Sequence, residues 1–276
     1  MNKKLKVCIA GASGFVGQEL IKLLVKHPNV EIIHLFVNNL GSQDTDLVKK
    51  HKLPDFRKID VKLINECDVL FSAMPHTHSQ NIIKSVNENL VIFDLSADFR
   101  LSNAETYESW YKVKHESKKL LKKAVYGLSE IFRDKIKKSN LIACPGCYPT
   151  SVLLPLIPLL KDNLINTNEI IIDSKSGYSG AGKKTLDAKL YPQIEKNIAI
   201  YGLSNHRHVP EIEEYLNMFI DKKTQINFTP HLIPTFRGIL STIYIKSNFN
   251  LTKLSESLLN FYKNSEFIRF YKKKLI

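Results

Sequence analysis

Cys147 is the residue of this chain whose surroundings most directly suggest chemistry. It follows a short apolar run at 141–143 and a Pro-Gly pair, and it precedes an apolar segment that predicts a helix from about Ser151 to Leu160. Unpaired backbone N–H groups and the positive end of the helix dipole favour the thiolate over the thiol at such a place. The sequence therefore predicts a nucleophilic cysteine and an enzyme with a covalent step.

Other interpretations of the cysteines remain open. Most cysteines of a reducing compartment are small buried hydrophobes, and we expect this of Cys8 and Cys67. Cys144 and Cys147 form a C-x-x-C pair, which serves redox chemistry or half of a zinc site. The only close histidine pair lies far downstream, so a metal site is not favoured. We expect Cys144 to pack inward rather than to form a disulfide with Cys147.

A histidine is the natural proton carrier beside a cysteine nucleophile at neutral pH. His206 and His208 stand directly before a segment that predicts a helix, whose first turn carries Pro210 and Glu211. Residues at such a position can face a cleft. Each of the two histidines is therefore a candidate acid/base.

A glycine-rich turn predicts a dinucleotide site near the N-terminus. The run 11–17, Gly-Ala-Ser-Gly-Phe-Val-Gly, follows an apolar strand and opens a helix. Glycines there allow a tight turn and close approach to a pyrophosphate, and the helix N-terminus attracts the anion. A tight turn without a ligand is the simpler alternative.

The end of the second strand favours NADP over NAD. NAD-specific sites usually carry an acidic residue there, whereas this strand ends in Asn38 and Asn39, followed by Gly41 and Ser42. A second glycine cluster, 176–182, is either a surface loop or a contact for the nicotinamide end. The residues expected to contact the cofactor are Gly11, Ser13, Gly14, Phe15, Val16, Gly17, Asn38, Ser42, Ser176 and Gly177.

The order of apolar segments predicts two domains in 276 residues. Strands expected at 5–10, 31–37, 69–73 and 91–95 alternate with helical patterns, which indicates a Rossmann-type, doubly wound parallel sheet. Later strands at 169–173, 226–229 and 238–246, with helices at 210–219 and 252–262, indicate an α+β catalytic domain with a mixed sheet. We place the NADP-binding domain at 1–144 and the catalytic, substrate-binding and dimerisation domain at 145–276.

Composition narrows the class of protein. Apolar content of 43% and charged content of 24% are those of a globular chain, and four irregularly spaced cysteines fit a cytoplasmic enzyme. The longest apolar run is too short to span a membrane, and the N-terminus does not resemble a signal peptide. The net charge of +13 comes from scattered lysines, including the segment 112–123, which we expect to be solvated surface. Without a basic stripe that carries aromatic residues, nucleic-acid binding is not expected.

Several stretches together resemble the N-acetyl-gamma-glutamyl-phosphate reductases, which are relatives of aspartate-semialdehyde dehydrogenase. They are 11–17, Asp94–Leu101, 124–128, Pro145–Thr150, 175–182, 206–208, 228–231 and 237–238, and they cover nearly the whole chain in the family's order. The resemblance implies NADPH-dependent reduction of an acyl phosphate to a semialdehyde in arginine biosynthesis, through a thioester on the cysteine of the Pro-Gly-Cys motif.

The resemblance also implies roles for individual residues. Cys147 is the nucleophile and His206 the acid/base, while His208, Tyr201 and Arg100 orient the substrate. It further implies a homo-oligomer, a dimer or a tetramer, in which the expected strand 238–246 is a candidate interface.

Two departures from the family pattern leave alternatives open. Cys144 takes a place where the family more often has a small or non-thiol residue, and the chain stops at Ile276, before the family's further strands and closing helix. A related reductase of an aminoadipyl or aspartyl phosphate, or an inactive NADP-binding remnant, therefore remain alternatives.

Overall fold

A parallel sheet organises the first half of the chain. The computed structural model describes residues 3–41, 45–183, 196–220 and 223–271, and these divide into two compact units, mainly 3–145 and 146–271. In the first unit, all strand pairs are parallel and the strand order is β3-β2-β1-β4-β5-β7-β6. The strands are β1 Leu5–Ala10, β2 Val30–Val37, β3 Phe56–Lys58, β4 Val69–Ser72, β5 Val91–Asp94, β6 Val125–Tyr126 and β7 Leu141–Ala143.

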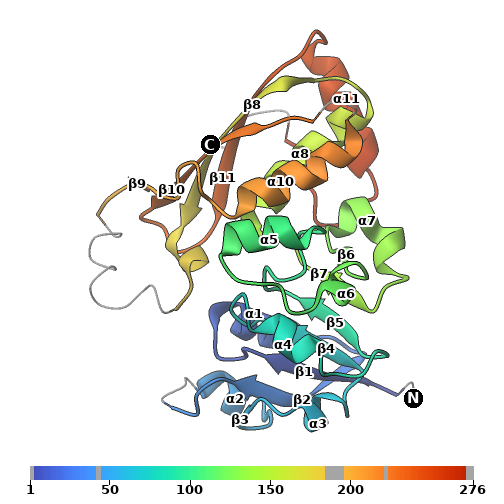
Figure 1. Cartoon of the computed structure of the whole chain (residues 1–276), viewed down its shortest axis with the longest axis vertical. Helices are drawn as coiled ribbons and strands as arrows, with labels where there is room; N and C mark the ends of the chain where they lie inside the picture. Colours follow the sequence, from blue (N-terminus) through green and yellow to red (C-terminus); the bar gives the residue numbers. More distant parts are fainter. Residues whose placement is uncertain (1–2, 42–44, 184–195, 221–222, 272–276) are drawn as a thin grey trace. The chain divides into compact units, whose positions relative to one another are not determined.

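Helices cover this sheet on both faces (Figure 1). In β1, Val7 and Ile9 enter one apolar cluster, whereas Cys8 and Ala10 enter another, so alternate side chains are buried on opposite faces. Each fully buried Val or Ile side chain contributes about 1.5–3 kcal/mol. The helices are α1 Phe15–Leu24, α2 Asp46–Lys50, α3 Val61–Ile64, α4 Ser79–Ile83, α5 Ala104–Tyr111, α6 Lys118–Leu121 and α7 Ser129–Ile136.

The strand order reverses between β1 and β4, which makes a switch point at their carboxyl ends. Open α/β sheets bind their ligands in the crevice at such a point. The glycine turn after β1 lies there, since a Cβ on Gly11 would come within 2.4 Å of the Ala73 carbonyl oxygen, just beyond β4. This unit has the predicted Rossmann-type architecture.

The second unit is built on a mixed sheet, as predicted, and its strand order is β11-β8-β10-β9. The strands β8 and β10 are parallel, while β11 pairs with β8 and β9 pairs with β10 in antiparallel fashion. The strands are β8 Asn166–Gly177, β9 Ala199–Ile200, β10 Ile226–Ile233 and β11 Ile239–Lys246. The helices are α8 Cys147–Lys161, α10 His208–Leu216 and α11 Leu251–Tyr262, with 3-10 turns at Tyr178–Ala181 and Asn217–Phe219.

Helix α8 contains Pro155 and Pro158, and a distant side chain compensates for one of them. Pro158 has no N–H to offer the carbonyl of Leu154, one turn earlier. The Tyr262 hydroxyl at the end of α11 donates to that oxygen at 2.5 Å. The same contact therefore satisfies a buried carbonyl and joins α11 to α8.

Two sequence expectations were wrong in detail. The helix expected from Ser151 begins at Cys147, because a proline such as Pro149 is tolerated in the first turn. The lysine-rich segment 112–123 is not simply solvated surface: His115 and Leu121 are buried. The His115 ring packs edge-on against Tyr107, and its Nε2 lies 2.7 Å from the Asp98 carbonyl oxygen.

Candidate active site

Cys147 is the first residue of α8 and its side chain is exposed. Gly146 caps the helix in an extended conformation, with φ −64° and ψ 158°, and its carbonyl accepts the first helical bond from Thr150 N–H at 3.0 Å. The backbone N–H groups of Cys147 and Tyr148 precede that bond, and Pro149 has none. The positive end of the helix therefore lies at the sulfur-bearing residue, which favours the thiolate.

Aromatic rings surround this helix start. The His206 ring lies 4.9 Å from that of His208, 5.4 Å from that of Tyr148 and 5.5 Å from that of Tyr201, measured between centroids. Tyr148 and Tyr201 share a hydroxyl contact of 2.9 Å. Desolvation raises the pKa of both phenols, and the neighbouring Cys147 sulfur raises them further. The structure thus brings together the predicted Cys147, His206, His208 and Tyr201.

His206 is held in one protonation state. The backbone N–H of His208 donates to its Nδ1 at 3.1 Å, so the proton of the neutral ring belongs on Nε2. Desolvation, with the Arg207 charge second, lowers the pKa of the His206 imidazole to about 4. At neutral pH this ring is uncharged, and Nε2–H is its hydrogen-bond donor.

The turn before Cys147 contacts the first turn of α10 at two points. Gly146 N–H donates to Oε1 of Glu211 at 2.8 Å. A Cβ on Gly146 would come within 2.5 Å of Nε2 of His208. Sequence reasoning assigned no role to Glu211 or to Tyr148, although both lie inside the motifs that it quoted.

Arg100 and Cys144 lie in the first unit, and each is fixed there. Arg100 is 9% exposed; its Nε donates to the Cys144 carbonyl at 2.8 Å and its Nη2 to the Leu95 carbonyl at 3.0 Å. Burial raises the pKa of the Cys144 thiol to about 12, so it is a poor nucleophile at neutral pH. Cys8 and Cys67 are buried, as predicted.

The motif 94–101 shapes the loop that follows β4. Asp98 is buried and accepts hydrogen bonds from Thr77 N–H at 2.6 Å, from Gln80 N–H at 3.0 Å and from the Tyr107 hydroxyl at 2.7 Å. Asp94 accepts from the Ser79 hydroxyl at 2.6 Å, and burial raises its pKa to about 6. These carboxylates hold the backbone beside the switch point.

The glycine turn fits a dinucleotide. A Cβ on Gly17 would come within 2.3 Å of the Gly11 carbonyl oxygen, so only glycine allows α1 to start this close to the turn. Above Gly14 a Cβ would meet only that same oxygen, at 3.4 Å, which leaves its outer side open to a ligand. Ser13 lies in the turn, and Phe15, Val16 and Gly17 form the first turn of α1.

The end of β2, where we expect the ribose of the cofactor, lies beside the glycine turn. The N–H groups of Gly11 and Ala12 both donate to the Phe36 carbonyl, at 2.9 and 3.0 Å, which holds the glycine turn beside the end of β2. Asn38 follows that end and is exposed. Ser42 lies outside the described residues.

Ser176 and Gly177 end β8 in the second unit. The Ser176 side chain contacts the Tyr148 phenol, and a Cβ on Gly177 would come within 2.9 Å of the Arg237 backbone. Packing therefore explains why residue 177 is a glycine. Contact of Ser176 and Gly177 with a cofactor stays a prediction.

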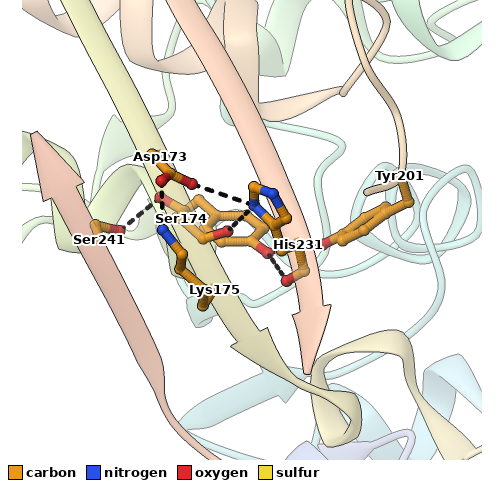
Figure 2. A network of polar contacts seen from close by, with 7 residues as sticks. Asp173, Ser174, Lys175, Tyr201, His231 and Ser241 are labelled. Atoms are coloured by element: carbon orange, nitrogen blue, oxygen red, sulfur yellow. Dashed lines mark hydrogen bonds and ion pairs between the residues drawn. The ribbon is translucent and has the colours of Figure 1, made fainter. Parts of the chain in front are cut away.

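A polar network on the sheet continues from Tyr201 (Figure 2). Asp173 and Lys175 stand on one face of β8 and form an ion pair, and His231 on β10 lies 3.2 Å from Asp173 Oδ1. On the opposite face, the Ser241 hydroxyl contacts the hydroxyls of Ser174 and Ser151, each at 2.7 Å. The second contact ties α8 to the sheet.

Three other kinds of feature could indicate function in the described residues: a cavity, a metal site and a membrane-spanning helix. A cavity of about 630 Å³ is lined by Lys4, Val30 and Glu31, at the amino ends of the strands and away from the switch point. Among the described residues, no three histidine, cysteine or acidic side chains group to hold a metal ion. Within the same residues, no helix is long and apolar enough to cross a membrane.

Comparison with known families divides the chain in the same order. Residues 6–139 match the family described as semialdehyde dehydrogenase, NAD binding domain, and residues 147–276 match semialdehyde dehydrogenase, dimerisation domain. The first half therefore belongs to a nicotinamide-cofactor domain family, and the second to a family that forms dimers.

Individual relatives are more specific. The chain is 42% identical to the probable N-acetyl-gamma-glutamyl-phosphate reductase, chloroplastic, of Arabidopsis thaliana, over 97% of this chain and 68% of that protein. It is 44% identical to the N-acetyl-gamma-glutamyl-phosphate reductase of Caldicellulosiruptor saccharolyticus, over 98% and 81%. Its fold is similar to aspartate semialdehyde dehydrogenase II from Vibrio cholerae, with a TM-score of 0.64 at 16% identity over 96% of this chain and 80% of that one.

Proposed function

Because the chain belongs to the N-acetyl-gamma-glutamyl-phosphate reductase family, we propose that it reduces N-acetyl-L-glutamyl 5-phosphate to the 5-semialdehyde in arginine biosynthesis, releasing phosphate. The observation that carries this proposal is Cys147 at the start of α8, with the His206 and His208 rings packed against the ring of the next residue, Tyr148. Residues 1–144 would bind the nucleotide, and residues 145–276 would bind the substrate.

Cys147 carries the first half of the proposed reaction. Its thiolate attacks the carbonyl carbon of the acyl phosphate, the bond from carbon to the phosphate oxygen breaks, and phosphate leaves. The product is a thioester on the Cys147 sulfur. The N–H groups of Cys147 and Tyr148 at the helix start are the available donors for the tetrahedral oxyanion.

His206 serves the second half. A bound nicotinamide cofactor would supply the hydride for the thioester carbon. As the carbonyl re-forms, the carbon–sulfur bond breaks, the sulfur leaves as the thiolate and the aldehyde departs; the Nε2–H of the neutral His206 ring donates a hydrogen bond to the adduct oxygen or to the departing sulfur. His208 and Tyr201 would orient the substrate. We retain Arg100 in that role only as a prediction, because its guanidinium already binds two backbone carbonyls.

NADP is the proposed cofactor. The exposed Asn38 follows β2 where an acidic residue would repel a 2′-phosphate, and the glycine turn is tied to the same strand end. The residues proposed to bind it are Gly11, Ser13, Gly14, Phe15, Val16, Gly17, Asn38, Ser42, Ser176 and Gly177.

We further propose a homodimer that forms through the outer face of the mixed sheet. The pairing of Leu240 with Lys175 and of Tyr244 with Ile171 places all four side chains on this one face. Leu240 is 65% exposed and Tyr244 56%. The opposite face of the sheet packs against α8 and α10 (Figure 1).

Phosphate-dependent oxidation of N-acetylglutamate semialdehyde, the reverse reaction, tests the function. With NADP we expect turnover of this aldehyde and little of aspartate semialdehyde. Preference for aspartate or aminoadipate semialdehyde would replace the substrate assignment. Cofactor binding without turnover of any of the three would favour the inactive, NADP-binding alternative.

A further inference from the structure

We propose that Glu211 is a positioning residue that fixes the turn before the nucleophile by holding the Gly146 N–H. The proposal rests on the proposed function in one respect, the role of Cys147 as nucleophile. In this proposal Glu211 acts through the backbone of Gly146.

The burial of Glu211 is the first observation. Its side chain is 1% exposed, and its Oε1 accepts the Gly146 N–H at 2.8 Å. Removing a carboxylate from water costs several kcal/mol unless hydrogen bonds compensate, so a buried glutamate is a poor choice for stability alone. Its hydrogen bond is directed at the residue that caps α8.

The second observation is that two side chains from the first turn of α10 contact Gly146. His208 and Glu211 are three residues apart on α10 and therefore share a face. The nearest atom of the His208 ring lies 2.5 Å from where a Cβ of Gly146 would be, while the Glu211 carboxylate accepts the N–H of the same residue. Because Cys147 is the next residue, these contacts determine where the helix starts and where its first N–H groups point.

The charge of Glu211 and its position have opposite effects on the Cys147 thiolate, so an experiment can separate them. A carboxylate near the helix start repels a thiolate, so the charge of Glu211 alone would disfavour the thiolate rather than favour it. The rings of His206, His208 and Phe228 contact the ring of Tyr148, the second residue of α8, and the Tyr201 hydroxyl contacts its phenol. If position matters, a neutral side chain of equal length keeps the function and a charged, shorter one loses it.

The chain offers a matched control on the same helix. Glu213 Oε1 accepts the Ile226 N–H at 3.0 Å, and this bond ties α10 to β10 rather than to the nucleophile turn. Shortening Glu213 therefore perturbs α10 by the same chemical change without touching Gly146.

The experiment compares Glu211→Gln, Glu211→Asp and Glu213→Asp in the full chain. Alkylation of Cys147 by iodoacetamide, followed against pH by peptide mass, reports the thiolate without any substrate. Steady-state kcat and KM for semialdehyde oxidation report the reaction. We expect Glu211→Gln within about threefold of wild type in kcat, because its amide oxygen still reaches the Gly146 N–H.

Glu211→Asp should lower kcat by about tenfold to hundredfold, the order of loss that a misplacement near 1 Å produces. The KM for NADP should not change, and the alkylation midpoint should move to higher pH. Glu213→Asp should match wild type in every measurement. If Glu211→Asp does not fold, Glu211→Ala replaces it, and the same loss in kcat is expected.

Wild-type behaviour of Glu211→Asp, or a loss in Glu211→Gln as large as in Glu211→Asp, would overturn the proposal. If the wild type does not turn over the semialdehyde, the proposed function fails, while the alkylation profiles still decide the role of Glu211.

Discussion

Replacing Gly146 with alanine should misplace His208 without disturbing the backbone. At φ −64° and ψ 158° the glycine occupies a region open to every residue, so alanine adds no backbone strain. The new methyl group, however, would lie 2.5 Å from Nε2 of His208, well inside contact distance. To restore an ordinary contact near 3.4 Å, the ring must retreat by about 0.9 Å.

The size of that retreat sets the expected loss. A misplacement near 1 Å in an active site can cost about 10²-fold, or about 2.7 kcal/mol of transition-state stabilisation. We therefore expect kcat/KM for the semialdehyde to fall about a hundredfold in Gly146→Ala. Stability should change by no more than about 1 kcal/mol, because a small gain from the unfolded state opposes a less favourable N-cap.

A double-mutant cycle with His208→Ala isolates the cause. Removing the ring makes room for the methyl group, so Gly146→Ala should cost little in that background. Steady-state kinetics and thermal unfolding of the four proteins provide the measurement. An equal loss in both backgrounds would show that the clash with His208 is not the reason, and full activity of Gly146→Ala would refute the reasoning altogether.

Four further outcomes are expected. Cys147→Ser should abolish turnover yet still bind NADP in a fluorescence titration; near-normal turnover would exclude the thioester. Asn38→Asp should shift preference from NADP toward NAD in kcat/KM, and a wild type that binds NAD more tightly would contradict the cofactor assignment. Leu240→Glu should lower the mass in sedimentation if the outer sheet face is the dimer interface, whereas an unchanged mass would exclude that face. For His206, the pKa near 4 lies below that of the unfolded chain, so its contribution to stability is fully present above about pH 6.5 and is lost as the pH falls toward 4. NMR titration of the ring should show no charge change between pH 5 and 7; a midpoint near 6.5 would contradict its desolvation.

The parallel sheet could be predicted from sequence because its signal is local. β1 has the bounds expected from its apolar run, and the glycine turn follows it directly. The strands that sequence reasoning missed, such as Phe56–Lys58 and Ala199–Ile200, have two or three residues and exist through their pairing. The burial of His115 was missed because it depends on Asp98, seventeen residues away.

In the candidate site, too, local features could be predicted from the sequence, whereas contacts between distant residues could not. The position of Cys147 at a helix start could be predicted because a strand, a turn and an apolar helical segment follow one another within a few residues. Glu211 could not, since its partner Gly146 lies 65 residues away and no local pattern indicates that the carboxylate is buried. The tautomer of His206 likewise depends on how the backbone folds between it and His208.

Arg100 illustrates why a quoted motif does not reveal what each of its residues does. A guanidinium offers several donors in a rigid plane, which suits an anionic substrate and a cluster of carbonyls equally well. Here Nε and Nη2 bind the carbonyls of Cys144 and Leu95, while the N–H of Cys144 donates to the Asp94 carbonyl at 2.8 Å. The carbonyl and the N–H of Cys144, the residue that follows β7, are thus both held by the motif 94–101. Arg100 therefore contributes to the position of Cys144, which directly precedes the Pro-Gly-Cys turn.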